Sequence, residues 1–138
     1  MTSAQGPDPA QLSDKRLSNT KLGKQLDRLR SISLALPEAT EELTWETEVN
    51  FRVRNKIFLF PGQGHQVMVK AERDELPALL GDRRFRPAPY LARGGWVVLD
   101  ISGGSGAQAV DWDEVTELIH TSYCLIAPKR LADLVRPR

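Results

Sequence analysis

The stretch "FRVRNKIFLFPGQGHQVMVK", Phe51–Lys70, contains three short apolar runs separated by two turn signals. In the first run, Phe51 and Val53 alternate with two arginines, and this period of two is typical of a half-buried β-strand. Asn55 tolerates a left-handed backbone, and "GQG" at 62–64 supplies the second turn, so the runs are predicted to be successive strands. Because such short links cannot span a parallel crossover, the strands are expected to be antiparallel.

Two further strands are predicted on either side of this stretch. "TWETE" (44–48) is expected to pair ahead of it, and "WVVLDI" (96–101) follows a connection rich in arginine and proline. The sequence therefore predicts a twisted antiparallel sheet of about five strands.

Helical patterns surround these strands. Leucines recur at helical spacing between Leu22 and Leu36, and Pro37 is expected to end that helix. A short helix is predicted within "AERDELPALLG" (71–81), ended by its glycine, and "KRLADLV" (129–135) is predicted to form the last one. Mostly antiparallel strands with helices on one face define a two-layer α+β domain.

The helix predicted in "DWDEVTELIHTSYCLIAP" (111–128) has the clearest start. Asp111 and Glu114 have the spacing of a capping box, in which each side chain bonds the other residue's backbone. Trp112 and Tyr123 belong to the apolar stripe of this helix, so both are expected in the core rather than in contact with a ligand.

Length and composition indicate an ordinary globular protein. A chain of 138 residues with 41% hydrophobic and 27% charged residues is typical of one domain. Residues 1–15 are small, polar and proline-containing, so we expect a disordered tail ahead of a single domain over residues 16–138. The net charge is only +1, so the total charge favours no class of partner.

The compartment is inferred from what the sequence lacks. Its single cysteine excludes an intrachain disulfide, and no apolar stretch reaches the ~20 residues of a membrane helix. The first residues have no apolar core resembling a signal peptide. We therefore expect a cytoplasmic protein without a membrane partner.

Catalytic chemistry has little support in the sequence. His65 falls in a predicted turn and His120 on a helix away from its apolar stripe, and neither lies near a nucleophile signature. Cys124 lies in an apolar segment and is interpreted as a small buried hydrophobe. One cysteine and two distant histidines do not have the spacing of a zinc site. We expect no enzyme, cofactor or metal, with a catalytic group assembled from distant residues as the alternative.

An acidic block is the one candidate for binding a hard cation. It comprises Glu38, Glu41, Glu42, Glu46 and Glu48. Clustered carboxylates can hold such cations. These glutamates belong to different predicted elements, so we favour a solvated acidic surface and expect no tight binding of iron or calcium.

Basic residues are the stronger candidates for a binding site, because arginine forks match the geometry of phosphate. They occur on the first hairpin, on the arginine-rich connection and at the start of the last helix. These nine residues are Arg52, Arg54, Lys56, Arg83, Arg84, Arg86, Arg93, Lys129 and Arg130. If the loops project at one end of the sheet, several of them would form one nucleic-acid-binding patch. The alternative is that they are simply solvated basic loops.

The connection "RPAPY" (86–90) is expected to be stiff, because its two prolines have a fixed φ and no backbone donor. It would hold the preceding arginines out from the domain, while Tyr90 and Trp96 anchor its other end on the core. The alternative is that the prolines only shape a connection, with Arg86 paired to a nearby acid such as Asp82.

Three segments, "FRVRNKIF", "RFRPAPYLARGGWVVLDI" and "IHTSYCLIAPKRL", resemble the MmcQ/YjbR family over roughly residues 30–135. The resemblance implies a fold related to frataxin (CyaY-like) and to bacterial secretion chaperones. It also implies DNA binding through a double-wing arrangement of hairpins, and it brings no catalytic residues. Members often have glycines at the hairpin turn, where Arg54 and Asn55 stand in this chain.

The function expected from the resemblance and the basic residues is non-enzymatic DNA binding. The arginine loop and the hairpin would contact phosphates, with weak and largely sequence-independent affinity. The alternative is a protein-interaction or chaperone-like module that uses an exposed sheet face without binding nucleic acid.

Overall fold

The computed structural model describes residues 21–44, 48–62, 65–103 and 109–136. Within them, six strands form one antiparallel sheet in the order β1-β2-β3-β4-β6-β5. The strands are β1 (Ala39–Thr44), β2 (Glu48–Val53), β3 (Lys56–Phe60), β4 (Gln66–Lys70), β5 (Phe85–Pro87) and β6 (Trp96–Asp100). The α+β class with its antiparallel sheet is thereby confirmed.

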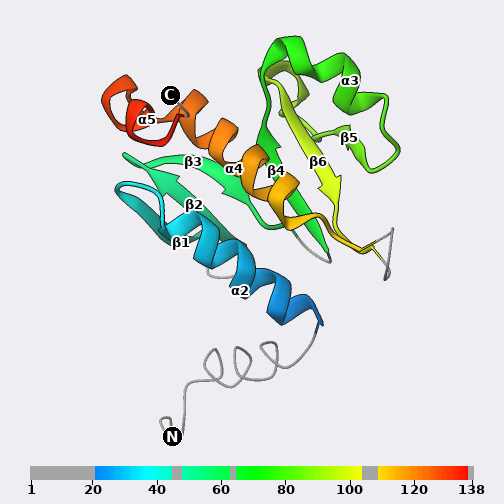
Figure 1. The fold of residues 1–138 in the computed structure, drawn as a ribbon, viewed down its shortest axis with the longest axis horizontal. Coiled ribbons are helices and arrows are strands. Elements are labelled where there is room, and N and C mark those ends of the chain that lie inside the picture. Colours follow the sequence, from blue (N-terminus) through cyan, green and yellow to red (C-terminus); the bar gives the residue numbers. More distant parts are fainter. Residues whose placement is uncertain (1–20, 45–47, 63–64, 104–108, 137–138) are drawn as a thin grey trace, which may run out of the picture.

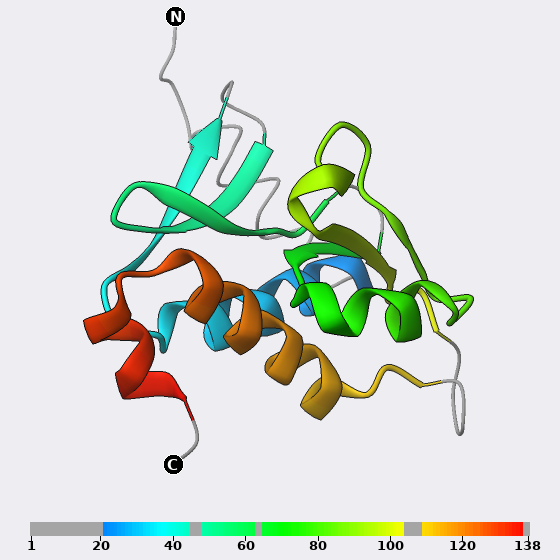
Figure 2. The ribbon, with the colours of Figure 1, turned by 90° about the horizontal axis from the view of Figure 1, so that it is seen from above.

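The helices are α2 (Lys21–Leu34), α3 (Leu76–Leu80), α4 (Trp112–Ile126) and α5 (Lys129–Val135), with short 3₁₀ turns η2 (Arg73–Glu75) and η3 (Ala92–Gly94). Figure 1 shows α2 and α4 crossing the sheet, and Figure 2 shows the helices gathered on one side of it. The opposite side is called the open face below. Among the described residues, no helix is both long and apolar enough to cross a membrane.

The predicted hairpin between β2 and β3 is confirmed. Arg54 and Asn55 have φ values of 50° and 66°, and Val53 pairs with Lys56 across this two-residue loop. Two consecutive left-handed residues match the right-handed twist of the paired strands, which is why such turns join hairpins. Asn55 tolerates this conformation well, whereas Arg54 adopts it without the freedom of glycine.

Two strands differ from the prediction. The first is Ala39–Thr44, within the acidic block, rather than 44–48, of which residues 45–47 lie outside the described part of the chain. It is an edge strand whose side chains are partly or fully exposed, and charged residues are tolerated at such an edge. The second is Phe85–Pro87, expected to be a loop. It forms the other edge of the sheet. An edge strand can contain a proline because the backbone groups on its outer side have no neighbouring strand to bond.

The core lies between the sheet and the helices. The register aligns Phe51, Leu59, Val69 and Val97 across four neighbouring strands, and all four are fully buried. Side chains directly opposite on antiparallel strands share a face, so this row faces the helices. From α4, the apolar stripe packs against it through Val115, Ile119 and Tyr123.

Tyr123 is a core residue, as predicted. Its ring meets Phe58 edge-to-face at 5.3 Å, and its hydroxyl donates to the Pro37 carbonyl at 2.6 Å. Trp112 fits the prediction only in part. It packs against the core but stays partly exposed, with the Arg28 guanidinium 5.2 Å from its ring, because it is the first residue of α4 and lies at the margin of the helical layer.

Ser122 of α4 is inserted into the sheet between β3 and β4. The register pairs Leu59 with Val69, so Phe58 and Lys70 are the next residues in line. The Ser122 hydroxyl, fully buried, donates to the Phe58 carbonyl at 2.6 Å and accepts from the Lys70 backbone N–H at 3.0 Å. One side chain therefore joins both strands to the helix that covers them.

Replacing Ser122 by alanine is expected to lower the free energy of unfolding by about 1–3 kcal/mol, because two backbone groups lose their hydrogen-bond partner in the interior. Urea denaturation of the parent and of Ser122→Ala measures this. The matched control is Ser31→Ala on the exposed side of α2, which should change stability by less than ~0.5 kcal/mol. Equal effects of the two substitutions would contradict the bridging role of Ser122.

Candidate nucleic-acid interface

The β2–β3 hairpin carries three of the predicted site residues, and their environments differ. The Arg52 guanidinium donates to Asn50 Oδ1 at 2.8 Å, to Asn55 Oδ1 at 3.0 Å and to Thr44 Oγ1 at 3.3 Å. These partners are uncharged, so they hold the side chain in place without neutralising it. Lys56 is exposed beside the turn.

Arg54, at the tip of this hairpin, is paired with Glu38. Its Nε and Nη2 atoms contact the two carboxylate oxygens at 2.6 and 3.1 Å. The hydrogen bonds from Arg54 hold the pKa of Glu38 below its usual value, and the charge of Arg130 acts in the same direction. The start of α5 therefore lies within electrostatic range of the hairpin tip. Lys129 and Arg130 are both exposed there.

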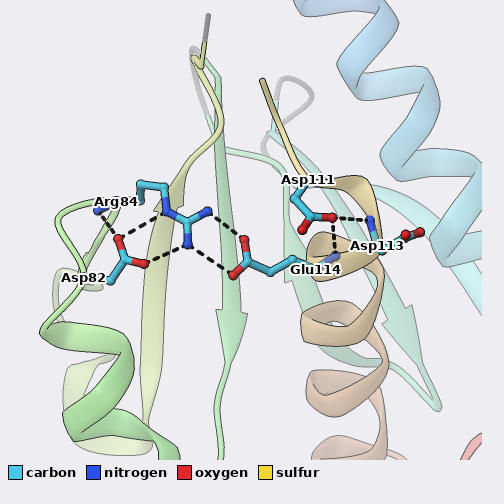
Figure 3. Close-up of polar contacts among 5 residues, drawn as sticks. All are labelled: Asp82, Arg84, Asp111, Asp113 and Glu114. Carbon is cyan, nitrogen blue, oxygen red and sulfur yellow. Dashed lines mark hydrogen bonds and ion pairs between the residues drawn. The ribbon is translucent and has the colours of Figure 1, made fainter. Parts of the chain in front are cut away.

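Arg84 is held by two carboxylates (Figure 3). Its guanidinium contacts Asp82 Oδ2 at 2.7 Å and Glu114 Oε1 at 2.7 Å, with further contacts to the second oxygen of each. These hydrogen bonds lower the pKa of Asp82 to about 2 and raise that of Arg84 above its usual value. The expectation that the loop holds Arg84 out from the domain is wrong, because α4 presents Glu114 to it.

The start of α4 is only partly as predicted. The Asp111 carboxylate caps the helix by accepting from the backbone N–H groups of Asp113 and Glu114, both at 3.1 Å. Glu114 directs both of its oxygens to Arg84, which ties the segment before β5 to the helix. The two charge-assisted hydrogen bonds from an arginine are stronger than a single hydrogen bond from a backbone N–H, which is why Glu114 contacts Arg84.

Arg83, Arg86 and Arg93 are exposed, and among the described residues no carboxylate lies within ion-pair distance of them. Phe85 is buried in the core, so alternation along β5 places Arg86 on the open face. Arg93 lies in η3, where its carbonyl accepts from Arg73 Nη2 at 3.1 Å. Arg86 therefore forms no ion pair with Asp82, the acid named in the alternative. Its charge does act on Asp100 of β6, whose pKa lies below the usual value chiefly because of hydrogen bonds from Ser102 and in part because of Arg86.

The nine predicted site residues do not form one patch. Three strands separate β2 from β5, a distance of roughly 19 Å at the usual strand spacing. The antiparallel pairings also place the start of β5, with Arg83 and Arg84, at the opposite end of the strands from the β2–β3 turn. Arg93 precedes β6 and lies at the same end as that turn.

Tyr90 differs most from the prediction. It was expected to anchor the connection on the core, but it is fully exposed and has a left-handed backbone, with φ of 64°. Ala88 is the anchor instead: it is buried, and its N–H donates to the Trp96 carbonyl at 3.1 Å. Trp96 packs on Phe60 with the ring centroids 6.0 Å apart, and the register places both on the open face rather than in the core.

Other polar residues serve the fold. Gln25 is buried and links His65 Nδ1 at 2.6 Å to the Ile101 carbonyl at 2.7 Å. His120 is half-buried on α4, and this burial lowers its pKa. Cys124 is half-buried, with its Sγ 3.7 Å from the Ala132 carbonyl, so it is less enclosed than predicted.

Two members of the acidic block are engaged by arginines. Glu38 pairs with Arg54 as described above, and Glu41 contacts Arg30 Nε at 2.6 Å. Glu46 lies outside the described residues. Within the described part of the chain, no group of three or more histidine, cysteine, aspartate or glutamate side chains is placed to hold a metal ion.

The Asp82–Arg84 contact predicts a specific acid sensitivity. A carboxyl whose pKa is depressed in the folded state stabilises it above the unfolded value of about 3.9, and this is lost as pH falls toward about 2. The melting temperature of Asp82→Asn should therefore fall less steeply than that of the parent between about pH 4 and pH 2. Asp74→Asn, at an exposed site on η2, is the control. Parallel curves for parent and Asp82→Asn would exclude this contribution.

Comparison with known proteins assigns the chain to a family. None of the curated proteins compared with this chain matches it. A family model described as YjbR matches residues 34–125, which span β1 to the last turn of α4 and include the β2–β3 hairpin, the 88–95 connection and Ser122. This match covers more than half of the chain, which therefore belongs to the YjbR family.

Proposed function

We propose that this protein binds nucleic acid without catalysing a reaction, and that Arg86 and Arg93 are its principal phosphate contacts. The observation that carries the proposal is their position. They are exposed on either side of the turn that contains Tyr90, and no carboxylate among the described residues lies within ion-pair distance of them. A guanidinium without a direct ion-pair partner can replace the counterions of a phosphate, which supplies the affinity. Of the two, Arg86 lies within electrostatic range of Asp100 on β6, whose pKa its charge helps to lower.

The hairpin provides a second, separate contact region. The hydrogen-bond partners of Arg52 are neutral, so no carboxylate competes with a phosphate for it, and Lys56, Lys129 and Arg130 are exposed nearby. Arg54 and Arg84 contribute less to the proposal, since each is matched by carboxylates that a phosphate would have to displace. The proposed interface is therefore smaller than the nine residues predicted from the sequence.

Binding of this kind is weak and largely blind to sequence. α2 and α4 turn their apolar sides to the sheet, and the exposed basic residues discussed above lie on turns, on an edge strand or at a helix start. Contacts from such positions go to phosphates, which position a protein on DNA, rather than to base edges, which specify sequence. The dissociation constant is expected on the order of 10⁻⁴–10⁻⁶ M at physiological salt.

The open face of the sheet favours a second candidate, a protein-interaction module. Ile57, Phe60, Met68 and Trp96 are only partly buried, and by register and alternation they belong to the face without helices. Partly exposed apolar side chains on such a face are typical of a surface that another protein covers.

Arg86→Ala and Arg93→Ala should each reduce the salt dependence of duplex binding by about 0.9 in the slope of log K against log [salt], because each removes one phosphate contact. Fluorescence anisotropy of a short labelled duplex across a salt series measures this. Lys24→Ala removes an exposed positive charge from α2 and should leave the slope unchanged. If the parent shows no binding at low salt, the proposal fails and the protein-interaction module is favoured.

A further inference from the structure

Tyr90 is presented to solvent by the backbone itself. Its side chain is fully exposed, and Leu91 beside it is 37% exposed. Its φ of 64° is unfavourable for any residue with a Cβ atom and is rare for a bulky one. A residue in such a conformation persists where its surroundings impose it, and residues of this kind cluster at functional sites.

The surroundings of Tyr90 account for this conformation. Pro89 precedes it with a fixed φ, and the Leu91 N–H closes the turn on the Ala88 carbonyl at 3.3 Å. Ala88 is in turn buried and bonded to Trp96 of β6. The aromatic ring is therefore carried at the tip of a short loop that is anchored at both ends. Because the backbone under the ring is already fixed, binding has to order only the tyrosine side chain and not the loop.

Positively charged residues lie on both sides of Tyr90 in the chain. Arg86 lies four residues before Tyr90 on the edge strand and Arg93 three residues after it on η3, and the Arg73 guanidinium contacts the Arg93 carbonyl. Proteins bind single-stranded nucleic acid by combining exposed aromatic rings, on which bases stack, with basic groups that hold the phosphates.

We propose that Tyr90 stacks on an unpaired base of single-stranded DNA or RNA while Arg86 and Arg93 hold the adjoining phosphates. This inference rests on the proposed nucleic-acid binding and assigns it a strand preference. In a duplex, neighbouring base pairs cover both faces of each base, so a ring at a loop tip has no base face to contact. A single strand offers such a face at every nucleotide.

The test compares the parent with Tyr90→Phe, Tyr90→Ala and Tyr90→Gly, using a labelled single strand and a duplex of the same sequence. Tyr90→Ala should weaken single-strand binding roughly 5- to 150-fold, the usual contribution of one base stacked on an aromatic ring. Tyr90→Phe keeps the ring and should bind like the parent. Duplex affinity should be the same for all four proteins. A 2-aminopurine base in the single strand should be quenched by the parent and by Tyr90→Phe only.

Tyr90→Gly and one control variant separate the effect of the ring from that of the loop backbone. Tyr90→Gly tolerates the left-handed backbone and should lose as much affinity as Tyr90→Ala; if it binds like the parent, the loop backbone rather than the ring is responsible and the inference is overturned. Leu134→Ala removes an exposed apolar side chain from α5 and should have no effect.

Three other outcomes would contradict the stacking role of Tyr90. If the parent binds nucleic acid but Tyr90→Ala binds the single strand as tightly as the parent does, the stacking role fails and the proposed function stands. If the parent binds neither form, the proposed function fails and this inference with it. If a poly-glutamate peptide binds as tightly as the single strand and is equally sensitive to Tyr90→Ala, the surface recognises an acidic protein segment and not a base.

Discussion

The buried hydroxyl of Ser122 is the contact on which the arrangement of this domain depends. It occupies the position where β3 and β4 would next pair, and it joins both strands to α4. An unsatisfied backbone group in the interior is costly, so the position of α4 along the sheet is closely constrained. Tyr123 then contacts Phe58, and Glu114, which precedes Ser122 by eight residues or about 12 Å along the helix, contacts Arg84.

The charged residues divide according to what they face. Arg30 and Arg84 contact carboxylates and join sheet edges to helices, and Arg54 joins the hairpin turn to Glu38 ahead of β1. Arg86 on β5 and Arg93 on η3 are exposed to solvent. Exposed ion pairs contribute little to stability individually, but they decide which positive charges remain for a partner. A chain with a net charge of +1 can therefore still present a local basic surface, since a polyanion responds to the nearby field and not to the total charge.

Membership of the YjbR family and the fold are established independently of any activity. The family match covers the β2–β3 hairpin and the 88–95 connection, which together carry four of the nine basic candidates. They lie in different parts of the sheet, so an extended ligand would have to contact them separately. A flexible single strand meets that requirement more easily than a rigid duplex, which agrees with the exposed ring of Tyr90.

Local sequence determined the elements whose causes are local. The turn at Arg54 and Asn55, the alternation of Phe51 with Val53 and the Asp111 cap depend on residues close in the chain, and all were predicted. Only the tertiary structure decided which carboxylate each arginine meets, since Glu114 lies 30 residues from Arg84 and is brought near by α4. The same holds for Tyr90: its aromatic character favoured the core, but the pairing of Ala88 with Trp96 fixes the loop so that the ring faces solvent. Such pairings between distant residues depend on how the strands and helices pack together, which no short stretch of sequence specifies.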